Sequence, residues 1–177
     1  MEIEFQPFNE TGRGRIAQLI NKSNQFNLTT RRYTESDVAR FECDPSLLTL
    51  QVRLRDRLGD NGMISVVICR WTQLEIGEID TWLMSCRVLG RGVEEAVLRE
   101  LLDHARQKGI RTLRGAYIPT SRNKLVERHY AKLGFVQVDR QSDGSTLWEL
   151  DVASSSVEPP PMEVKRYGLG DVSAATA

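Results

Sequence analysis

A glycine-containing turn separates a strand candidate from the most regular helical pattern in this chain. Residues 75–88, EIGEIDTWLMSCRV, form the last of three consecutive strand candidates. Residues 90–109, GRGVEEAVLRELLDHARQKG, place apolar side chains at helical spacing, and Gly109 supplies a natural helix end. The turn between them is Arg87-Val88-Leu89-Gly90-Arg91-Gly92. A strand that passes directly into a helix in this way is the basic unit of an α/β fold.

The same turn is a candidate anion-binding site. Glycine lets the backbone turn sharply and approach a ligand closely. The first amides of a helix lack partners within the helix and point outward, and the helix dipole adds positive potential there. A pyrophosphate group can bind at such a position, and Arg87 and Arg91 add side-chain charge. The alternative is a tight strand-to-helix turn with no ligand.

The remaining patterns extend this unit in both directions. Thr34 and Asp37 resemble a capping box that begins a short helix. GDNG (59–62) predicts the turn of a hairpin. Strands are expected at 3–9, 47–56, 62–71 and 112–118, helices at 14–23, 35–42 and 121–133, and a final hairpin from FVQVDR and STLWELD around SDGS (142–145). This order predicts an α/β (α+β) fold with a mixed sheet and helices on both faces.

A change of composition near residue 152 divides the chain. Residues 1–151 form the predicted domain, whereas 152–177 are rich in proline, serine and small residues. We expect this second part to be a tail that is partly disordered and partly docked through Met162, Val164 and Tyr167.

Charge and cysteine content exclude several classes of protein. Lys plus Arg and Asp plus Glu both number 24, so the basic excess of a nucleic-acid-binding protein is missing. No apolar run approaches the roughly 18 residues that span a bilayer. The first residues lack the layout of a signal peptide. Three cysteines and two histidines show no metal-ligand spacing. We therefore expect a cytoplasmic protein with free thiols, no metal, no membrane contact and no nucleic-acid partner.

The turn and a second motif together resemble the two cofactor-binding motifs of the GNAT superfamily of acyltransferases. Arg87-x-x-Gly90-x-Gly92 is followed by a helix with Asn123 and Tyr130 and then by LGF (133–135). The resemblance spans roughly residues 3–150. It implies a GNAT-like mixed, mostly antiparallel sheet, with the pantetheine thiol alongside the strand that ends at Cys86.

The GNAT resemblance also implies roles for individual residues. The turn 87–92 would bind the pyrophosphate of coenzyme A, Asn123 would contact the pantetheine arm, and Tyr130 would protonate the departing thiolate. The alternative for Tyr130 is a core aromatic residue with a solvated hydroxyl. The cofactor would be coenzyme A or the 4'-phosphopantetheine of a carrier protein.

Three longer strings resemble a narrower group, the C-terminal part of FkbH-like proteins. They are NQFNLTTRRYTE, GDNG and IDTWLMSCRVLGRGVEEAVL. FkbH-like proteins pair a HAD-type, phosphatase-like domain with a GNAT-like domain and are associated with loading phosphoglycerate-derived glyceryl units onto acyl carrier proteins in polyketide-type pathways. The resemblance implies two partners, an acyl carrier protein and a HAD-type domain in cis or in trans. No DxDxT motif occurs here, so the chain is an excised domain or a stand-alone relative.

Four residues are candidate catalytic groups. Cys86 precedes Arg87 and could accept an acyl group as a thioester, with its thiol activated by Arg87 and the helix N-terminus; the alternative is a small buried apolar residue. His129 could be its base or a packed core histidine. Asp80, with Glu78, lies on the strand where GNAT enzymes often carry a general base, and solvation of the strand is the alternative. Tyr130 is the fourth candidate.

The loop 24–32, NQFNLTTRR, is the candidate acceptor site. Amides, hydroxyls and guanidinium groups are concentrated in it, which suits a polyol such as glycerate together with a phosphate or carboxylate. The alternative is a solvated loop whose side chains cap its own backbone. The candidate substrate-binding residues are Asn24, Gln25, Asn27, Thr29, Arg31 and Arg32.

The expected function is therefore acyl transfer from a phosphopantetheine thioester, with glyceryl loading onto a carrier protein as the specific form. Two alternatives stay open: an acetyl-CoA-dependent N-acetyltransferase, and a non-catalytic module that docks a carrier protein.

Overall fold

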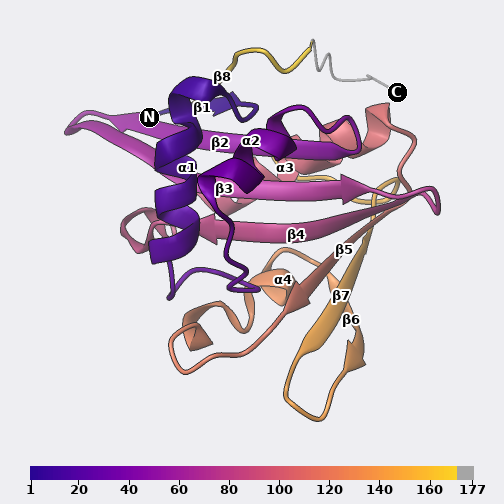
Figure 1. The fold of residues 1–177 in the computed structure, drawn as a ribbon. Coiled ribbons are helices and arrows are strands. Elements are labelled where there is room, and N and C mark those ends of the chain that lie inside the picture. Colours follow the sequence, from indigo (N-terminus) through magenta and orange to yellow (C-terminus); the bar gives the residue numbers. More distant parts are fainter. Residues whose placement is uncertain (171–177) are drawn as a thin grey trace.

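One eight-stranded sheet organises the described part of the chain (Figure 1). The computed structural model describes residues 1–170. Its elements are β1 (Glu2–Gln6), α1 (Glu10–Lys22), α2 (Glu35–Glu42), β2 (Leu47–Asp56), β3 (Gly59–Trp71), β4 (Ile76–Met84), the 3-10 helix η1 (Cys86–Val88), α3 (Val93–Gln107), β5 (Thr112–Tyr117), the 3-10 helix η2 (Lys124–Val126), α4 (His129–Lys132), β6 (Val136–Arg140), β7 (Thr146–Asp151) and β8 (Glu163–Arg166).

The sheet is mixed and mostly antiparallel, as the sequence predicts. Its strand order is β6-β7-β5-β4-β3-β2-β1-β8. Only two neighbouring pairs are parallel, β4 with β5 and β1 with β8. The parallel pair β4–β5 lies in the middle of the sheet, and the strand-helix unit of β4 and α3 connects its two members.

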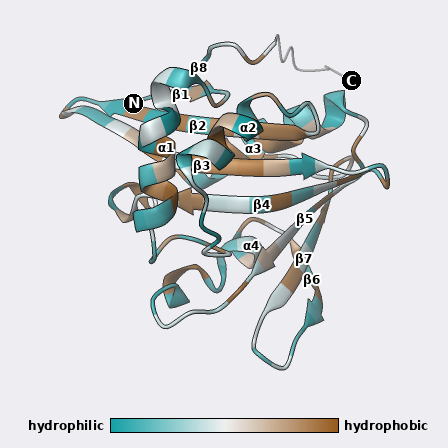
Figure 2. Cartoon of the chain, in the orientation of Figure 1, coloured by the Kyte–Doolittle hydropathy of each residue, from teal (hydrophilic) through white to brown (hydrophobic). Residues whose placement is uncertain are grey.

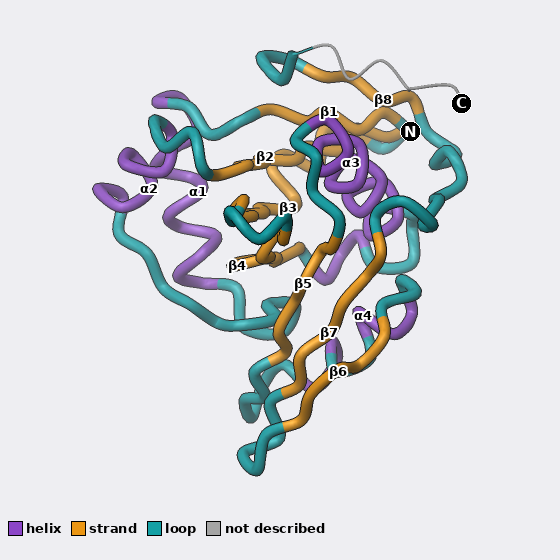
Figure 3. Tube along the Cα trace, turned by 90° about the vertical axis from the view of Figure 1, so that its right-hand side faces the viewer, coloured by secondary structure: helices purple, strands orange, loops and turns teal. Residues whose placement is uncertain are grey.

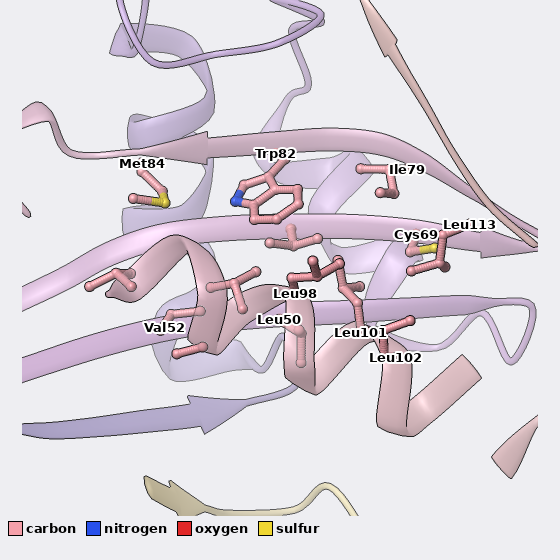
Figure 4. Close-up of a cluster of buried hydrophobic side chains, with 14 of the residues drawn as sticks. Leu50, Val52, Cys69, Ile79, Trp82, Met84, Leu98, Leu101, Leu102 and Leu113 are labelled. Atoms are coloured by element: carbon pink, nitrogen blue, oxygen red, sulfur yellow. The ribbon is translucent and has the colours of Figure 1, made fainter. Parts of the chain in front are cut away.

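Helices cover both faces of the sheet, which confirms the second part of the prediction. Figure 3 shows α1 and α2 on one side and α3 and α4 on the other. On the first side, Ile16 and Ile20 of α1 are fully buried with Val66 of β3. On the other side, the leucines of α3 pack over Leu50 and Trp82 (Figure 4). The hydrophilic residues of α1 and α2 in Figure 2 lie mainly on the surfaces that point away from the sheet.

The capping box at the start of α2 forms as predicted. The Asp37 amide donates to Thr34 Oγ1 at 3.1 Å, and the Thr34 amide donates to Asp37 Oδ2 at 2.8 Å. This pair fixes where the connector between α1 and α2 ends, because it satisfies two amides at the helix start.

Two local predictions are wrong. The β2–β3 hairpin turns at residues 57–58, where Asp56 pairs with Gly59, so GDNG (59–62) belongs to β3. The Leu58 amide donates to Asp56 Oδ1 at 2.8 Å, which stabilises the earlier turn. Residues 121–133 are not one helix but η2 and α4, and Arg128, at φ −102° and ψ 11°, lies outside the helical region directly before α4. Leu125, expected on the apolar face of that helix, is 55% exposed.

The segment after residue 152 is more ordered than expected as far as it is described. β8 extends the sheet beside β1, and Met162 and Val164 pack on the core. Arg166 of β8 donates to both carboxylate oxygens of Glu100 on α3, at 3.1 and 2.9 Å. Tyr167 stays 48% exposed. Residues 171–177 of the predicted tail lie outside the described part.

Candidate functional site

β4 and β5 separate half-way along their length (Figure 1). They pair only from Ile76–Ile79 to Thr112–Gly115. At this point β4 carries a bulge, since Ile68 of β3 pairs with Thr81 and Cys69 pairs with Ile79, leaving Asp80 as the extra residue. A bulge bends its strand and re-aims its side chains. The C-terminal half of β4 therefore has an edge that neither β3 nor β5 covers.

Residues 26–28, which we name the closing segment, occupy that edge. The Leu28 amide donates to Trp82 O at 3.3 Å, and the Met84 amide donates to Phe26 O at 3.1 Å. On the opposite side, the Ile118 amide beyond β5 donates to Leu28 O at 2.9 Å. The closing segment thus lies as a short antiparallel strand between the diverging ends of β4 and β5.

Two fully buried asparagines hold the closing segment. Asn123 Nδ2 donates to Asn27 O at 3.0 Å and to Ile118 O at 2.9 Å, while its Oδ1 accepts from the Thr120 amide at 2.7 Å. Asn27 Oδ1 accepts from the Thr30 amide at 2.9 Å. In this conformation both amide groups bind the chain itself, so Asn27 does not face an acceptor site and Asn123 does not face a ligand.

An aromatic cluster lies beside the closing segment. The ring of His129 meets the rings of Phe26, Trp82 and Tyr130, with centroids 5.1, 4.5 and 5.5 Å away. All four side chains are at least nine-tenths buried. Burying Phe26 and Leu28 stabilises the closed arrangement by about 1.5–3 kcal/mol for each side chain.

Several buried side-chain polar atoms near the diverging strands and at the start of α3 have no hydrogen-bond partner in the described part of the chain. Residues 1–170 contain five such side-chain atoms. Three belong to the aromatic cluster, one follows the closing segment, and one lies in the first turn of α3. Leaving each unsatisfied costs about 1–3 kcal/mol, so a ligand that reached them would gain stabilising bonds. They are Trp82 Nε1, His129 Nε2, Tyr130 Oη, Thr30 Oγ1 and Glu94 Oε2.

The Tyr130 hydroxyl is buried and has no hydrogen-bond partner within residues 1–170. Burial raises the pKa of its hydroxyl far above the ordinary value, so the group stays protonated. Its ring lies on Gly115 of β5, where an added Cβ would be 2.2 Å from Tyr130 Cζ. A glycine at 115 is therefore required for the ring to lie against the sheet beside β4.

His129 is a weak base in this position. Burial and, to a smaller extent, the charge of Lys132 lower its pKa to about 3. The imidazole is therefore neutral at pH 7 and holds a proton poorly. Cys86 is exposed at the end of β4, whereas His129 is buried in the aromatic cluster. The geometry favours the core-histidine alternative for this residue.

Asp80 anchors the connector between α1 and α2. Its carboxylate pairs with Arg31 and accepts from Tyr33 Oη at 2.8 Å, and its carbonyl accepts from Thr29 Oγ1 at 2.9 Å. Burial and the bond to Asp80 raise the pKa of Tyr33 to about 12. Arg32 binds the carbonyls of Ile20 and Ser23. Thus Thr29 and Arg31 hold the connector on Asp80 of β4, and Arg32 holds it on the end of α1.

Cys86 shares a pocket with part of the predicted acceptor loop. The pocket has a volume of about 700 Å³ and lies at the C-terminal end of β4. Asn24 and Gln25 line it together with Cys86, and Lys22 and Arg122 add positive charge. The structure therefore brings the candidate nucleophile and two candidate substrate-binding residues to one place, which we name the Cys86 pocket.

The turn 87–92 has the backbone that its glycines predict. Gly90 and Gly92 have φ of 69° and 79°, in the left-handed region, and Gly92 caps α3. The Gly90 amide donates to Glu94 Oε1 at 3.3 Å, so a carboxylate already lies at this helix start. Val88 is buried and Leu89 half-buried, so both serve packing.

The two arginines of the turn differ. Arg91 pairs with Asp56 at the end of β2 and holds the pKa of that carboxyl at about 2. Arg87 is exposed and donates to Ser85 Oγ at 3.3 Å. Of the two, Arg87 is the one available for a phosphate.

The described part of the tail passes over the same helix start. A Cβ on Gly92 would lie 3.6 Å from both Pro161 Cδ and Met162 Cε. Residues 156–161 and the facing residues of α3 and α4 enclose a pocket of about 400 Å³. The proline-rich stretch therefore forms one wall of the groove between α3 and α4.

This architecture is found in known acetyltransferase structures. The GNAT domain of PAT from S. lividans matches with a TM-score of 0.64 and 20% identity, over 83% of this chain and 89% of that chain. The ribosomal-protein-S18-alanine N-acetyltransferase from Escherichia coli matches with a TM-score of 0.61 and 15% identity, over 87% and 96%. The chain has the GNAT fold. Aminoglycoside acetyltransferase AAC(6')-Ib in complex with coenzyme A matches with a TM-score of 0.59 and 17% identity, over 84% and 94%.

At these identities the likeness concerns the fold alone. No protein-family model and no curated protein sequence matches the chain.

Within residues 1–170, no three His, Cys, Asp or Glu side chains are grouped to hold a metal ion. None of the helices described has the length and apolar character that a membrane crossing requires.

Sequence reasoning missed the closing segment and Trp82. Residues 24–32 lack periodicity, so nothing in them predicts a strand. Trp82 reads as an ordinary apolar strand residue. The available signal was Asn27, since a buried asparagine often holds an irregular backbone through its side-chain amide.

Proposed function

We propose that this GNAT-fold chain is an acyltransferase whose donor is a phosphopantetheine thioester, of coenzyme A or of a carrier protein. One observation carries the proposal: all five unpartnered buried polar atoms within residues 1–170 lie beside the diverging strands or at the start of α3. Buried polar atoms that lack a partner require an explanation, and a polar ligand beside them supplies one. The three GNAT-fold structures named above include one bound to coenzyme A.

Three groups have distinct roles in the proposed reaction. The turn 87–92 and Arg87 hold the phosphate of the donor. The Tyr130 hydroxyl, kept protonated by burial, gives its proton to the departing pantetheine sulfur. The aromatic cluster excludes water from the thioester, which limits hydrolysis.

The Cys86 pocket favours a small polar acyl group such as glyceryl. Asn24 and Gln25 offer amides to hydroxyl groups of the acyl chain. The Cys86 thiolate attacks the donor thioester, so one C–S bond forms while another breaks and the donor leaves as a thiol. The thiol of a carrier protein then gives its proton to the Tyr130 phenolate and attacks the Cys86 thioester. A C–S bond to the carrier forms while the bond to Cys86 breaks, and Cys86 leaves as the thiolate. With an acyl carrier protein and a HAD-type domain as partners, the product is a glyceryl-carrier thioester.

Transfer to an amine is the second candidate, because S18-alanine N-acetyltransferase has the same fold. It requires a base for the amine, and Asp80 is occupied by Arg31 and Tyr33 in this conformation. A carrier-docking module without turnover is the third.

The test is a turnover assay on the wild type and on Tyr130→Phe. Acetyl-CoA and glyceryl-carrier thioester are offered as donors, with a holo carrier protein or a panel of amines as acceptors. We expect transfer between thiols, and at least a tenfold lower kcat for Tyr130→Phe because the phenol proton is lost, which corresponds to about 1.4 kcal/mol in barrier height. Acetyl transfer to amines would support the second candidate. Carrier binding without any turnover would support the third.

A further inference from the structure

We infer that the closing segment is a displaceable strand: the pantetheine arm binds to the edge of β4 that residues 26–28 now cover, and it binds only when they withdraw. This inference rests on the proposed function. It adds a conformational step, in which one segment of the chain and the ligand compete for the same backbone groups.

The competition follows from the hydrogen bonds. Trp82 O and the Met84 amide form the open edge of β4, and the closing segment uses both. A pantetheine arm contains two amide groups and can pair with a strand edge in the same way. An edge with one carbonyl and one amide cannot pair with the closing segment and with an arm at once, so one must leave.

The closed conformation has an unfavourable backbone angle and several unsatisfied polar atoms among the described residues. Thr30, two residues after the segment in the connector, has φ of 55°, which is unfavourable for a β-branched residue, and its Oγ1 is buried without a partner within residues 1–170. The polar atoms of Trp82, His129 and Tyr130 also remain unsatisfied while the segment is closed. Withdrawal would relieve Thr30 and open the cluster to the polar groups of a ligand.

Three side chains also hold the connector between α1 and α2 against β4. Arg31, Tyr33 and Thr29 all bind Asp80 at the bulge of β4. Arg31 is 45% exposed in its side chain and makes its ion pair at the surface, so it can be changed without disturbing the core. Breaking this pair should raise the open population and leave the fold intact.

Amide hydrogen exchange on the full-length chain, with coenzyme A as the probe, tests the inference. Ligand binding should change hydrogen exchange at the Leu28 amide and leave it unchanged at the Met84 amide. In the free chain both should be protected. With saturating coenzyme A, the Leu28 amide should exchange much faster because it loses Trp82 O, whereas the Met84 amide should stay protected because the arm replaces Phe26 O.

Two variants should change the fraction of open molecules in opposite directions, and a third variant is the control. Arg31→Gln should bind coenzyme A roughly tenfold more tightly, because apparent affinity scales with the open fraction. Thr30→Gly, which relieves the left-handed strain of the closed state, should bind it more weakly. Arg111→Gln breaks a surface ion pair with Glu75, outside the connector and the Cys86 pocket, and should leave exchange at Leu28 unchanged.

The outcomes separate this inference from the proposed function. If coenzyme A binds and Leu28 remains protected, the closing segment is a fixed part of the site and the inference is overturned while the proposed function stands. Binding by Arg31→Gln alone would support the inference in its strongest form. If neither protein binds coenzyme A or a holo carrier protein, both are refuted.

Discussion

Gly115 determines where the Tyr130 ring can lie. A methyl group at this position would be 2.2 Å from Tyr130 Cζ, and Tyr130 is buried and cannot move outward freely. We expect Gly115→Ala to lower the free energy of unfolding by about 1–3 kcal/mol, the usual cost of overpacking, and to reduce transfer because the hydroxyl shifts. Urea denaturation and a turnover assay measure the two effects.

Gly14→Ala is the matched control for Gly115→Ala. Gly14 lies on the exposed side of α1, and the nearest atom to an added Cβ is Glu35 Oε1 at 3.9 Å. Alanine there should be neutral or stabilising by about 0.5–1 kcal/mol, because glycine is unfavourable within a helix. Equal losses in both variants would contradict the steric argument.

Cys86 should become acylated during transfer. It is exposed in a pocket with Asn24 and Gln25, whereas Cys69 is buried, and burial raises the pKa of the Cys69 thiol strongly. Intact-protein mass spectrometry after addition of an acyl-carrier donor should show one acyl group in the wild type and none in Cys86→Ser. Cys43→Ser, at the other exposed thiol, should still be labelled. Full carrier loading by Cys86→Ser would leave direct transfer between bound thiols.

His129 should make the fold sensitive to acid. Its pKa is about 3 in the folded chain against 6.5 for the ordinary group, so below pH 6.5 the unfolded chain binds a proton that the folded chain does not. Stability therefore falls as pH decreases through this window. Each pKa unit corresponds to about 1.4 kcal/mol, so His129→Leu should remove roughly 2–3 kcal/mol of the loss between pH 6.5 and about pH 4. Parallel acid titrations of the two proteins that coincide would argue against this cause.

At the level of the elements, the start of α3 has a testable backbone requirement. Gly92 and Gly109 have left-handed φ of 79° and 69° at opposite ends of α3. Alanine should cost about 1–2 kcal/mol of stability at either position because of this conformation. Only Gly92→Ala should weaken binding of coenzyme A, by about tenfold or 1.4 kcal/mol, because only that end would contact the phosphate in the proposed function. Calorimetric titration of both variants distinguishes strain from binding, and equal affinities would refute the phosphate site.

Regular elements with strong patterns could be predicted from the sequence. β2 was expected at 47–56 and α2 at 35–42, and the structure has these bounds, because alternation and a capping box are local signals. The broken helix at 121–133 could not be predicted, since no glycine or proline marks the break at Arg128.

The candidate site was predictable in its backbone and less so in its side chains. The turn 87–92 was identified because glycine spacing at a helix start is a local feature. The engagement of Thr29 and Arg31 with Asp80 was not, since that partner lies in β4. Polar residues in a loop predict that hydrogen bonds and ion pairs form, but they do not identify the partners.

At the scale of the whole molecule, an ion pair joins β8, the last strand, to helix α3. Glu100 of α3 is 1% exposed in its side chain and is held by Arg166 of β8 and by His104. Arg166→Met leaves that carboxylate buried with one partner. We expect a loss of about 2–3 kcal/mol in urea denaturation, below the usual range for a broken buried pair because Arg166 itself is 29% exposed.

The neighbouring Lys165 serves as the control. It pairs with Glu2 at the surface, with its side chain 37% exposed, and Lys165→Met should cost less than about 1 kcal/mol. The double variant Glu100→Leu with Arg166→Leu should recover most of the loss of Arg166→Met, since no unpaired charge remains. A large loss in the double variant would show that β8 is held by other contacts.

The bond between Asn27 and Asn123 has a consequence for how the chain folds. It joins residues 96 positions apart, and both belong to irregular segments. The entropy of closing so long a loop is recovered only after β4 and β5 have already brought the two segments together. We therefore expect the closing segment to dock after the rate-limiting step, so substitutions in it should accelerate unfolding while leaving the folding rate nearly unchanged. The sheet of this molecule should form first, and its candidate site should be completed last.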